Sequence, residues 1–131
     1  GPISPSASGP LYQQIVDGLR RAVSEGRLEP GTALPSFRVL AAQLLVSLIT
    51  VKRAYEELER EGIIFRRQGL GTFVAEQGAA ASREAKLQLA REQFAAGARE
   101  AAEAGLDPGE VEALAIEAIR SSSSSTRRKK K

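Results

Sequence analysis

The stretch VSLITVKRAYEELEREG, residues 46–62, joins hydroxyl, aliphatic and basic side chains at the start of a candidate helix. Ser47 is a typical N-cap residue, and an aliphatic pair, Leu48 and Ile49, follows it directly. Hydroxyl and basic groups contact the phosphates and base edges of DNA, and aliphatic groups contact thymine methyl groups in the major groove. We therefore expect the first turn of this helix to contact duplex DNA.

Helical geometry separates the two aliphatic residues. If Val51 marks the centre of the buried stripe, Leu48 lies close to that stripe. Ile49 shares the outward face with Lys52, Arg53 and Glu56. For Leu48, packing at the helix start and contact with DNA both stay open. For Ile49, contact with a thymine methyl group competes with contact with another protein and with a merely tolerated change. Phosphate contact is the favoured interpretation of the two basic residues.

Three helices and a hairpin are expected to position this stretch. Apolar spacing predicts a first helix near residues 10–25 and a second, capped by a serine, over 36–44. The third helix is expected over 48–61. Two β-prone runs, IIFRR and TFVA, flank the turn QGLG, which is a hairpin signature. This order predicts a mainly α fold with a small β-wing, a winged helix-turn-helix domain over residues 10–76.

A short helical region is expected to follow a small-residue linker at 77–82. Two helices are predicted over residues 83–120, and in the second of them Asp107 and Glu110 can form a capping box. Two helices alone have little core, so we expect their apolar side to be buried against a second copy of the chain. A pocket between the subunits for an unknown small-molecule effector stays open. The candidate dimerisation residues are Leu87, Phe94, Leu106, Val111, Leu114 and Ala118.

Both ends of the chain have sequences of low complexity. Residues 1–9 are rich in Ser, Pro and Gly and begin with Gly-Pro, typical of the remnant of a cleaved tag, so we expect disorder. Residues 121–131 join a serine run to RRKKK, which predicts a disordered basic tail, either merely solvated or holding DNA electrostatically. The formal charge of +3 is uneven, being mildly basic over residues 10–75 and acidic over 76–120.

The composition argues against several classes of function. The chain has no Cys and no His, so thiolate and imidazole ligands for metals are missing, and so is the usual proton-transfer group. The QGLG turn lacks the spacing of a phosphate-binding P-loop, and the Glu residues fall on amphipathic helices as solvated faces. The longest apolar stretch is too short to span a bilayer. We expect a cytoplasmic protein that is not an enzyme and needs no metal or cofactor.

The segments PLYQQIVDGLRRAVSEGRLEPGTALPS, VKRAYEELEREGII and GTFVAE together resemble the DNA-binding domain of the GntR family of bacterial transcription regulators. The resemblance covers residues 10–76. The helical remainder, with AGLDPGEVEAL, is similar to the short YtrA-like branch, whose C-terminal part is about two dimerising helices. The resemblance implies a homodimer that binds a near-palindromic operator in double-stranded DNA, usually as a repressor.

The resemblance also indicates which residues contact DNA. It implies that the arginine of the segment PSFR contacts the phosphate backbone. It also implies that the start of the third helix reads bases and that the wing glycines enter the minor groove. Together with the helix placement above, this defines the candidate site. The candidate DNA-binding residues are Arg38, Ser47, Leu48, Ile49, Thr50, Lys52, Arg53, Gln68, Gly69 and Gly71.

Five positions depart from the family pattern. Val39 stands where glutamate commonly completes a capping box, and Leu45 stands at a turn position normally held by glycine. Leu48 and Ile49 replace arginine and a polar residue, and Leu70 replaces a frequent basic residue at the wing tip. These apolar replacements keep a second hypothesis open, a winged-helix protein-interaction module that has lost base-specific reading of DNA.

Overall fold

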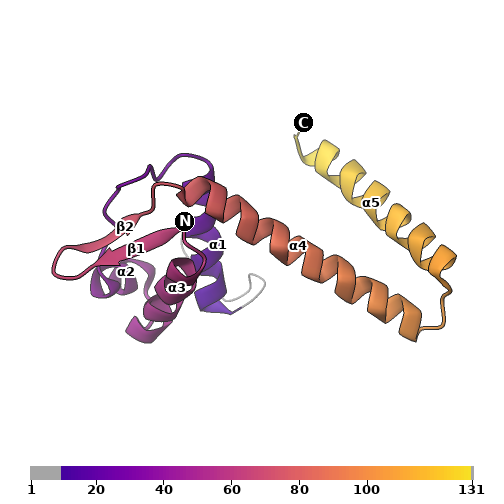
Figure 1. The fold of residues 1–131 in the computed structure, drawn as a ribbon, viewed down its shortest axis with the longest axis horizontal. Coiled ribbons are helices and arrows are strands. Elements are labelled where there is room, and N and C mark those ends of the chain that lie inside the picture. Colours follow the sequence, from indigo (N-terminus) through magenta and orange to yellow (C-terminus); the bar gives the residue numbers. More distant parts are fainter. Residues whose placement is uncertain (1–9, 131) are drawn as a thin grey trace. The chain divides into compact units, whose positions relative to one another are not determined.

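The computed structural model describes the backbone of residues 10–130 and the side chains of residues 10–123. The fold is mainly helical with one two-stranded antiparallel sheet, as the sequence predicts (Figure 1). Residues 1–9, for which the sequence predicts disorder, lie outside the described residues. In chain order the elements are α1 (Leu11–Ser24), α2 (Phe37–Leu44), α3 (Leu48–Arg60), β1 (Ile64–Arg67), β2 (Gly71–Val74), α4 (Gly78–Glu103) and α5 (Pro108–Lys130).

The chain divides into two compact units, and the boundary between Leu87 and Gln88 lies inside α4. The stretch 77–82, expected as a linker, is helical from Gly78 onwards. Its three alanines are the strongest helix formers, and both Gly78 and Ser82 are buried in the first unit. The first turns of α4 therefore belong to the winged-helix unit.

The core of the first unit fills the space between α1, α3 and the wing. Side chains at helical spacing on α1 and α3 are buried together with residues from both strands, and the apolar face of α2 packs against them. Removal of this apolar surface from water is the main stabilising contribution. The buried core residues are Ile15, Val16, Val23, Ala41, Val51, Ala54, Tyr55, Leu58, Ile63, Ile64 and Val74.

Tyr55 joins α3 to the segment that leads into α2. Its ring meets the Phe37 ring edge-on, with 5.2 Å between centroids, and its hydroxyl donates a hydrogen bond to the carbonyl oxygen of Pro35 at 2.8 Å. Burial raises the pKa of Tyr55 to about 12, so the hydroxyl keeps its proton and the bond. This contact fixes the start of α2 relative to α3.

The turn between α2 and α3 is closed by a left-handed residue that is not glycine. Leu45 has φ 57° and ψ 44°, and its side chain is 91% exposed. Its amide and that of Val46 both donate to the carbonyl oxygen of Ala41, which ends α2. A left-handed conformation costs a residue with a Cβ about 1–2 kcal/mol. The turn therefore carries backbone strain, with no burial of the leucine side chain to offset it.

We expect Leu45→Gly to raise the free energy of unfolding by about 0.5–1 kcal/mol, since relief of strain outweighs the greater freedom of glycine in the unfolded chain. Chemical denaturation followed by tyrosine fluorescence measures the change. Leu45→Ala is the matched control, because it shortens the side chain and keeps the Cβ. Equal stability of the glycine and alanine variants would contradict the strain argument.

The wing is a short hairpin held against the rest of the unit by a third segment. β1 and β2 pair antiparallel, with Arg67 opposite Gly71, and residues 68–70 form the connecting loop. The loop needs left-handed residues, Gly69 at φ 78° and Gly71 at φ 122°. The amide of Leu34 donates to the carbonyl of Thr72 at 2.8 Å. The chain that enters α2 is thus bonded to the wing.

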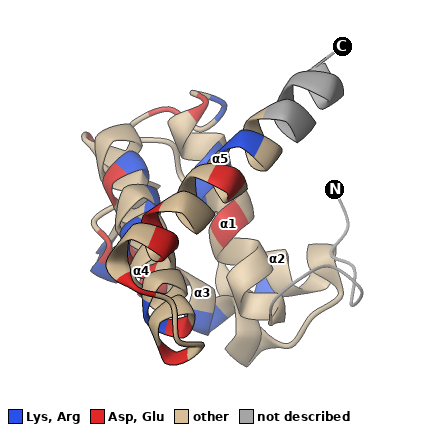
Figure 2. Cartoon of the chain, turned by 90° about the vertical axis from the view of Figure 1, so that its right-hand side faces the viewer, with Lys and Arg blue, Asp and Glu red and all other residues tan. Residues whose placement is uncertain are grey.

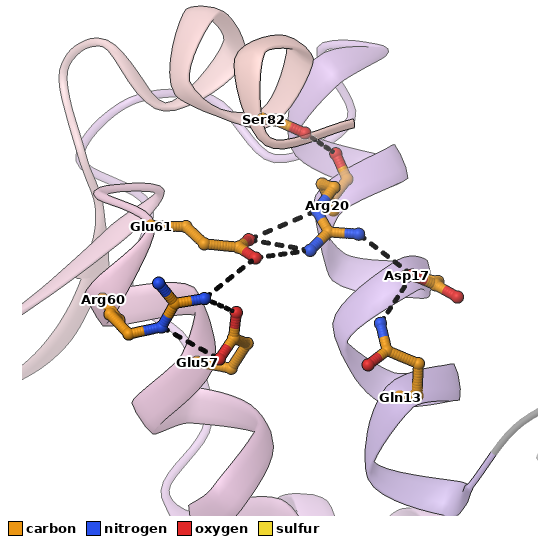
Figure 3. Close-up of polar contacts among 7 residues, drawn as sticks. All are labelled: Gln13, Asp17, Arg20, Glu57, Arg60, Glu61 and Ser82. Atoms are coloured by element: carbon orange, nitrogen blue, oxygen red, sulfur yellow. Dashed lines mark hydrogen bonds and ion pairs between the residues drawn. The ribbon is translucent and has the colours of Figure 1, made fainter. Parts of the chain in front are cut away.

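A buried arginine ties three helices together. Arg20 of α1 is 4% exposed, and its guanidinium donates to the two carboxylate oxygens of Glu61 at 2.8 and 2.7 Å and to Asp17 at 3.0 Å (Figure 3). The Ser82 hydroxyl, near the start of α4, donates to the Arg20 carbonyl oxygen at 2.7 Å. α1, the end of α3 and the start of α4 therefore meet at one point.

The two carboxyl groups at the end of α3 respond differently to their surroundings. Burial raises the pKa of Glu61, with the Arg20 guanidinium opposing this effect by favouring the carboxylate. A hydrogen bond from the exposed Arg60 lowers the pKa of Glu57. Glu61 thus depends on its buried cation to stay charged inside the protein.

The second unit consists of the rest of α4 and α5. The capping box that starts α5 is confirmed, because the Glu110 amide donates to Asp107 at 2.9 Å and the Asp107 amide donates to Glu110 at 3.1 Å. The backbone of α5 continues to Lys130, whereas the low-complexity sequence predicts a disordered tail from residue 121. Serine is only moderately unfavourable inside a helix, so the helix can continue through the serine run.

Candidate nucleic-acid interface

The first turn of α3 is closed by its own hydroxyl groups. The Ser47 side chain accepts a hydrogen bond from the Thr50 amide at 3.2 Å, which confirms the predicted cap. The two hydroxyl groups also share a hydrogen bond of 2.7 Å. Both polar side chains at the tip of the helix are therefore engaged within the helix itself.

The two aliphatic residues of this turn are exposed. Ile49 is 75% exposed and Leu48 is 42% exposed, whereas Val51 in the next turn is completely buried. Ile49 faces outward, as its helical position predicts. Leu48 lies outside the buried core cluster, and packing at the helix start and contact with DNA both stay predictions for it. The tip of α3 thus presents an aliphatic surface with nothing in its own unit to cover it.

Basic residues follow this surface on the outward face of α3. Lys52 and Arg53 are both exposed. The Arg53 guanidinium lies 3.9 Å from the centroid of the Tyr12 ring on α1. Stacking of this kind orients an arginine while leaving its N–H groups free for an anion. Tyr12 is missing from the predicted site, because no local sequence signal connects residues so far apart in the chain.

The start of α2 offers a second anion-binding feature. The Ser36 hydroxyl accepts from the Val39 amide at 3.2 Å, so the cap forms without the glutamate that is typical of this position. Arg38 is exposed in the first turn, where the backbone amides give the helix end a partial positive charge. An arginine at such a position suits contact with a phosphate group.

An open groove of about 480 Å³ lies between the start of α2 and the wing. Arg66 of β1 lies 5.0 Å from the Phe37 ring centroid, and Arg67 lies 5.5 Å from that of Phe65. The groove is also lined by both arginines and by three candidate DNA-binding residues of the wing, Gln68, Gly69 and Gly71. The groove combines cations, a helix N-terminus and glycine backbone, which together suit a sugar-phosphate strand.

The predicted dimerisation residues are only partly brought together. Phe94, Val111, Leu114 and Ala118 line an apolar groove of about 220 Å³ in the second unit, and Phe94 is 66% exposed. Leu106 is half-buried and does not line this groove. Leu87 belongs to the first unit and does not line this groove.

Charge is distributed unevenly over the elements. Figure 2 shows basic residues on α3, and acidic together with basic residues along α4 and α5. In the part of the chain that the structure describes, no group of three or more His, Cys, Asp or Glu residues could hold a metal ion. None of the described helices is long and apolar enough to cross a membrane. The exposed basic residues of α2, α3 and the wing all belong to the first unit, and together they suit the binding of a polyanion.

Known regulatory proteins are similar to this chain in sequence. The sequence profile of the bacterial regulatory proteins of the gntR family matches residues 11–74. The HTH-type transcriptional repressor YtrA of Bacillus subtilis is 39% identical over 92 residues, 70% of this chain and 71% of that protein. The uncharacterized regulator YhcF of the same bacterium is 38% identical over 105 residues, 80% of this chain and 86% of that protein.

Solved structures agree with the sequence comparison. YtrA from Sulfolobus acidocaldarius, a GntR-family transcription factor, has a TM-score of 0.55 at 31% identity and covers 69% of this chain and 95% of its own. The DNA-binding domain of AraR in complex with operator ORE1 has a TM-score of 0.50 at 31% identity and covers 57% of this chain and 92% of its own. This chain therefore belongs to the GntR family of bacterial DNA-binding transcription regulators.

Proposed function

We propose that the chain is a homodimeric repressor that binds a near-palindromic operator. The exposed first turn of α3, followed by cations on the outward face of that helix, carries this proposal. The similarity to the repressor YtrA and to the operator-bound domain of AraR supports it. Binding of a duplex and blocking of a promoter need no catalytic group.

In this proposal α3 enters the major groove with its N-terminal turn against the bases. Arg38 and the amides at the start of α2 hold a phosphate of the adjacent backbone, and the wing follows the neighbouring minor groove. Lys52 and Arg53 contact phosphates on the walls of the groove. Each contact is assigned from exposure, charge and the position of its element in the first unit.

The second unit supplies the proposed dimer contact. Two helices leave the aromatic ring of Phe94 and a row of aliphatic side chains largely exposed to water, and a second copy of the same surface is the partner that covers both at once. A twofold dimer would place its recognition helices in successive major grooves, about 34–36 Å apart. Because the two recognition helices would be related by the twofold axis, the operator they bind would be palindromic.

Two measurements test the proposal. A duplex selected from a random library by the full chain should bind, by fluorescence anisotropy, far more tightly than unselected duplexes, and its log affinity should fall linearly with log salt concentration. Light scattering should give the mass of two chains. Equal affinity for selected and unselected duplexes would refute specific binding, and a monomer at all concentrations would refute the dimer.

We expect Arg38→Ala to weaken binding to every duplex by about tenfold, because one charged hydrogen bond to phosphate is lost without change in base reading. The salt dependence should fall by about one released counterion. Anisotropy titrations on selected and unselected duplexes measure both. Arg99→Ala, which removes the same charge from the second unit, should have little effect. An Arg38 effect confined to the selected sequence would contradict phosphate contact.

The exposed aliphatic residues also favour a second candidate, a protein-interaction module that no longer reads bases. Leu48, Ile49 and Leu70 are the residues concerned, and Leu70 at the wing tip is 72% exposed. Selection from the random library distinguishes the two functions, since an interaction module would enrich no sequence. Recovery of one enriched, palindromic sequence would exclude this second candidate.

A further inference from the structure

We infer that the first turn of α3 reads the C5 methyl groups of pyrimidines, with Ile49 as the reading residue and Leu48 beside it. This inference rests on the proposed binding of α3 in the major groove and names the feature of the base that the site recognises. It concerns thymine and, by the same chemistry, 5-methylcytosine.

The polar groups of this turn are already engaged. The Ser47 hydroxyl accepts the Thr50 amide and shares a second hydrogen bond with the Thr50 hydroxyl. Withdrawing the Ser47 oxygen from the Thr50 amide would uncap the helix at a cost of about 1 kcal/mol, so only the one hydroxyl proton that the pair does not use is left for a base. Between these two residues, the side chains of Leu48 and Ile49 have no donor or acceptor and can offer a base edge only alkyl groups. Direct hydrogen-bonded reading is therefore disfavoured at these two positions.

The exposure of Ile49 has no structural explanation within its own unit. Its side chain is 75% exposed beside the exposed Lys52 and the stacked Arg53. An apolar protein partner would have to bury or neutralise both cations, whereas a duplex neutralises them with phosphate and offers an apolar group between the phosphate walls. Charge complementarity thus selects DNA as the occupant of this surface.

The major groove displays one kind of apolar group. The C5 methyl of thymine projects into it, and cytosine displays the equivalent group only when it is methylated, whereas the minor groove displays neither. Burial of one methyl group against an aliphatic side chain contributes about a fourfold change in affinity. A site with two aliphatic residues per subunit can therefore prefer methylated pyrimidines measurably, without a base hydrogen bond.

The test replaces single thymines by deoxyuridine in the duplex selected from the random library. Deoxyuridine keeps every hydrogen-bonding group and removes only the methyl. For the wild-type full chain we expect a loss of about fourfold at one or two positions of each half-site and no loss elsewhere. Ile49→Ala should bind the thymine and uracil duplexes equally well at one of those positions.

Leu70→Ala is the matched control, since it shortens an equally exposed aliphatic residue on the wing, where no C5 methyl is displayed. It should keep the full preference for thymine over uracil. Equal binding of thymine and uracil duplexes by the wild-type chain at every position would overturn the inference while leaving sequence-specific binding intact. Failure to select any duplex would instead refute the proposed function.

A second readout uses cytosine. At the position that loses affinity with uracil, a cytosine–guanine pair carrying 5-methylcytosine should bind the wild-type chain about fourfold more tightly than the unmethylated pair. Ile49→Ala should not distinguish the two duplexes. A preference for methylcytosine that survives Ile49→Ala would assign the reading to another residue and overturn the role of Ile49.

Discussion

Arg20→Ala should lower the free energy of unfolding by about 3 kcal/mol, because removal of one partner of a buried ion pair leaves the other charge with only the exposed Arg60, at 4.0 Å, to compensate it. The stranded group is Glu61, whose pKa burial already raises. Both carboxylate oxygens of Glu61 accept hydrogen bonds from the one guanidinium, which is 4% exposed. Urea denaturation followed by tyrosine fluorescence reports this change through the buried Tyr55.

Two further variants give this prediction its control. Arg21→Ala removes the neighbouring, exposed arginine of the same helix and should change stability by no more than about 0.5 kcal/mol. Arg20→Met combined with Glu61→Leu replaces the pair by apolar groups, and its stability should recover much of the loss. A loss below about 1 kcal/mol for Arg20→Ala would mean that the pair behaves as a solvated surface contact.

Phe94→Glu should abolish the proposed dimer and lower operator affinity by on the order of 10²-fold, because two linked half-site contacts become one. Phe94 is the aromatic residue that lines the apolar groove of the second unit, and its side chain is largely exposed. A carboxylate there would have to be buried unpaired in any dimer that uses this surface. Light scattering measures the mass, and anisotropy with the selected duplex measures the affinity.

Ala95→Glu is the matched control for this variant, since it adds the same charge at the next residue, which is exposed and outside the groove. It should remain a dimer with the affinity of the wild-type chain. Far-ultraviolet circular dichroism checks that both variants keep their helices. A Phe94→Glu protein that still has the mass of two chains would place the dimer contact elsewhere.

Local features of the fold could be predicted from short stretches of sequence. Hydroxyl caps at Ser36 and Ser47 and the capping box at Asp107 each form between residues three apart, so the side chains that make them are visible in the sequence. The periodic apolar spacing of α1 and α3 likewise predicts the buried faces.

The ends of these elements were harder to predict. The alanines after the wing extend α4 back to Gly78, and the serine run continues α5 to Lys130, although small and polar residues in sequence are equally typical of linkers and tails. In the first case the burial of Ser82 against α1 decides the outcome. Tertiary contact of this kind leaves no local pattern.

By itself the sequence determined the fold class, because periodicity, caps and turn residues act over a few positions of the chain, and the resemblance of its motifs indicated the family. Only the tertiary structure decided that Arg20 is buried against Glu61, that Arg53 stacks on Tyr12, and that Leu48 stays exposed. Each of these depends on which helix faces lie against each other. Burial and pairing between distant residues are properties of that packing rather than of any short stretch.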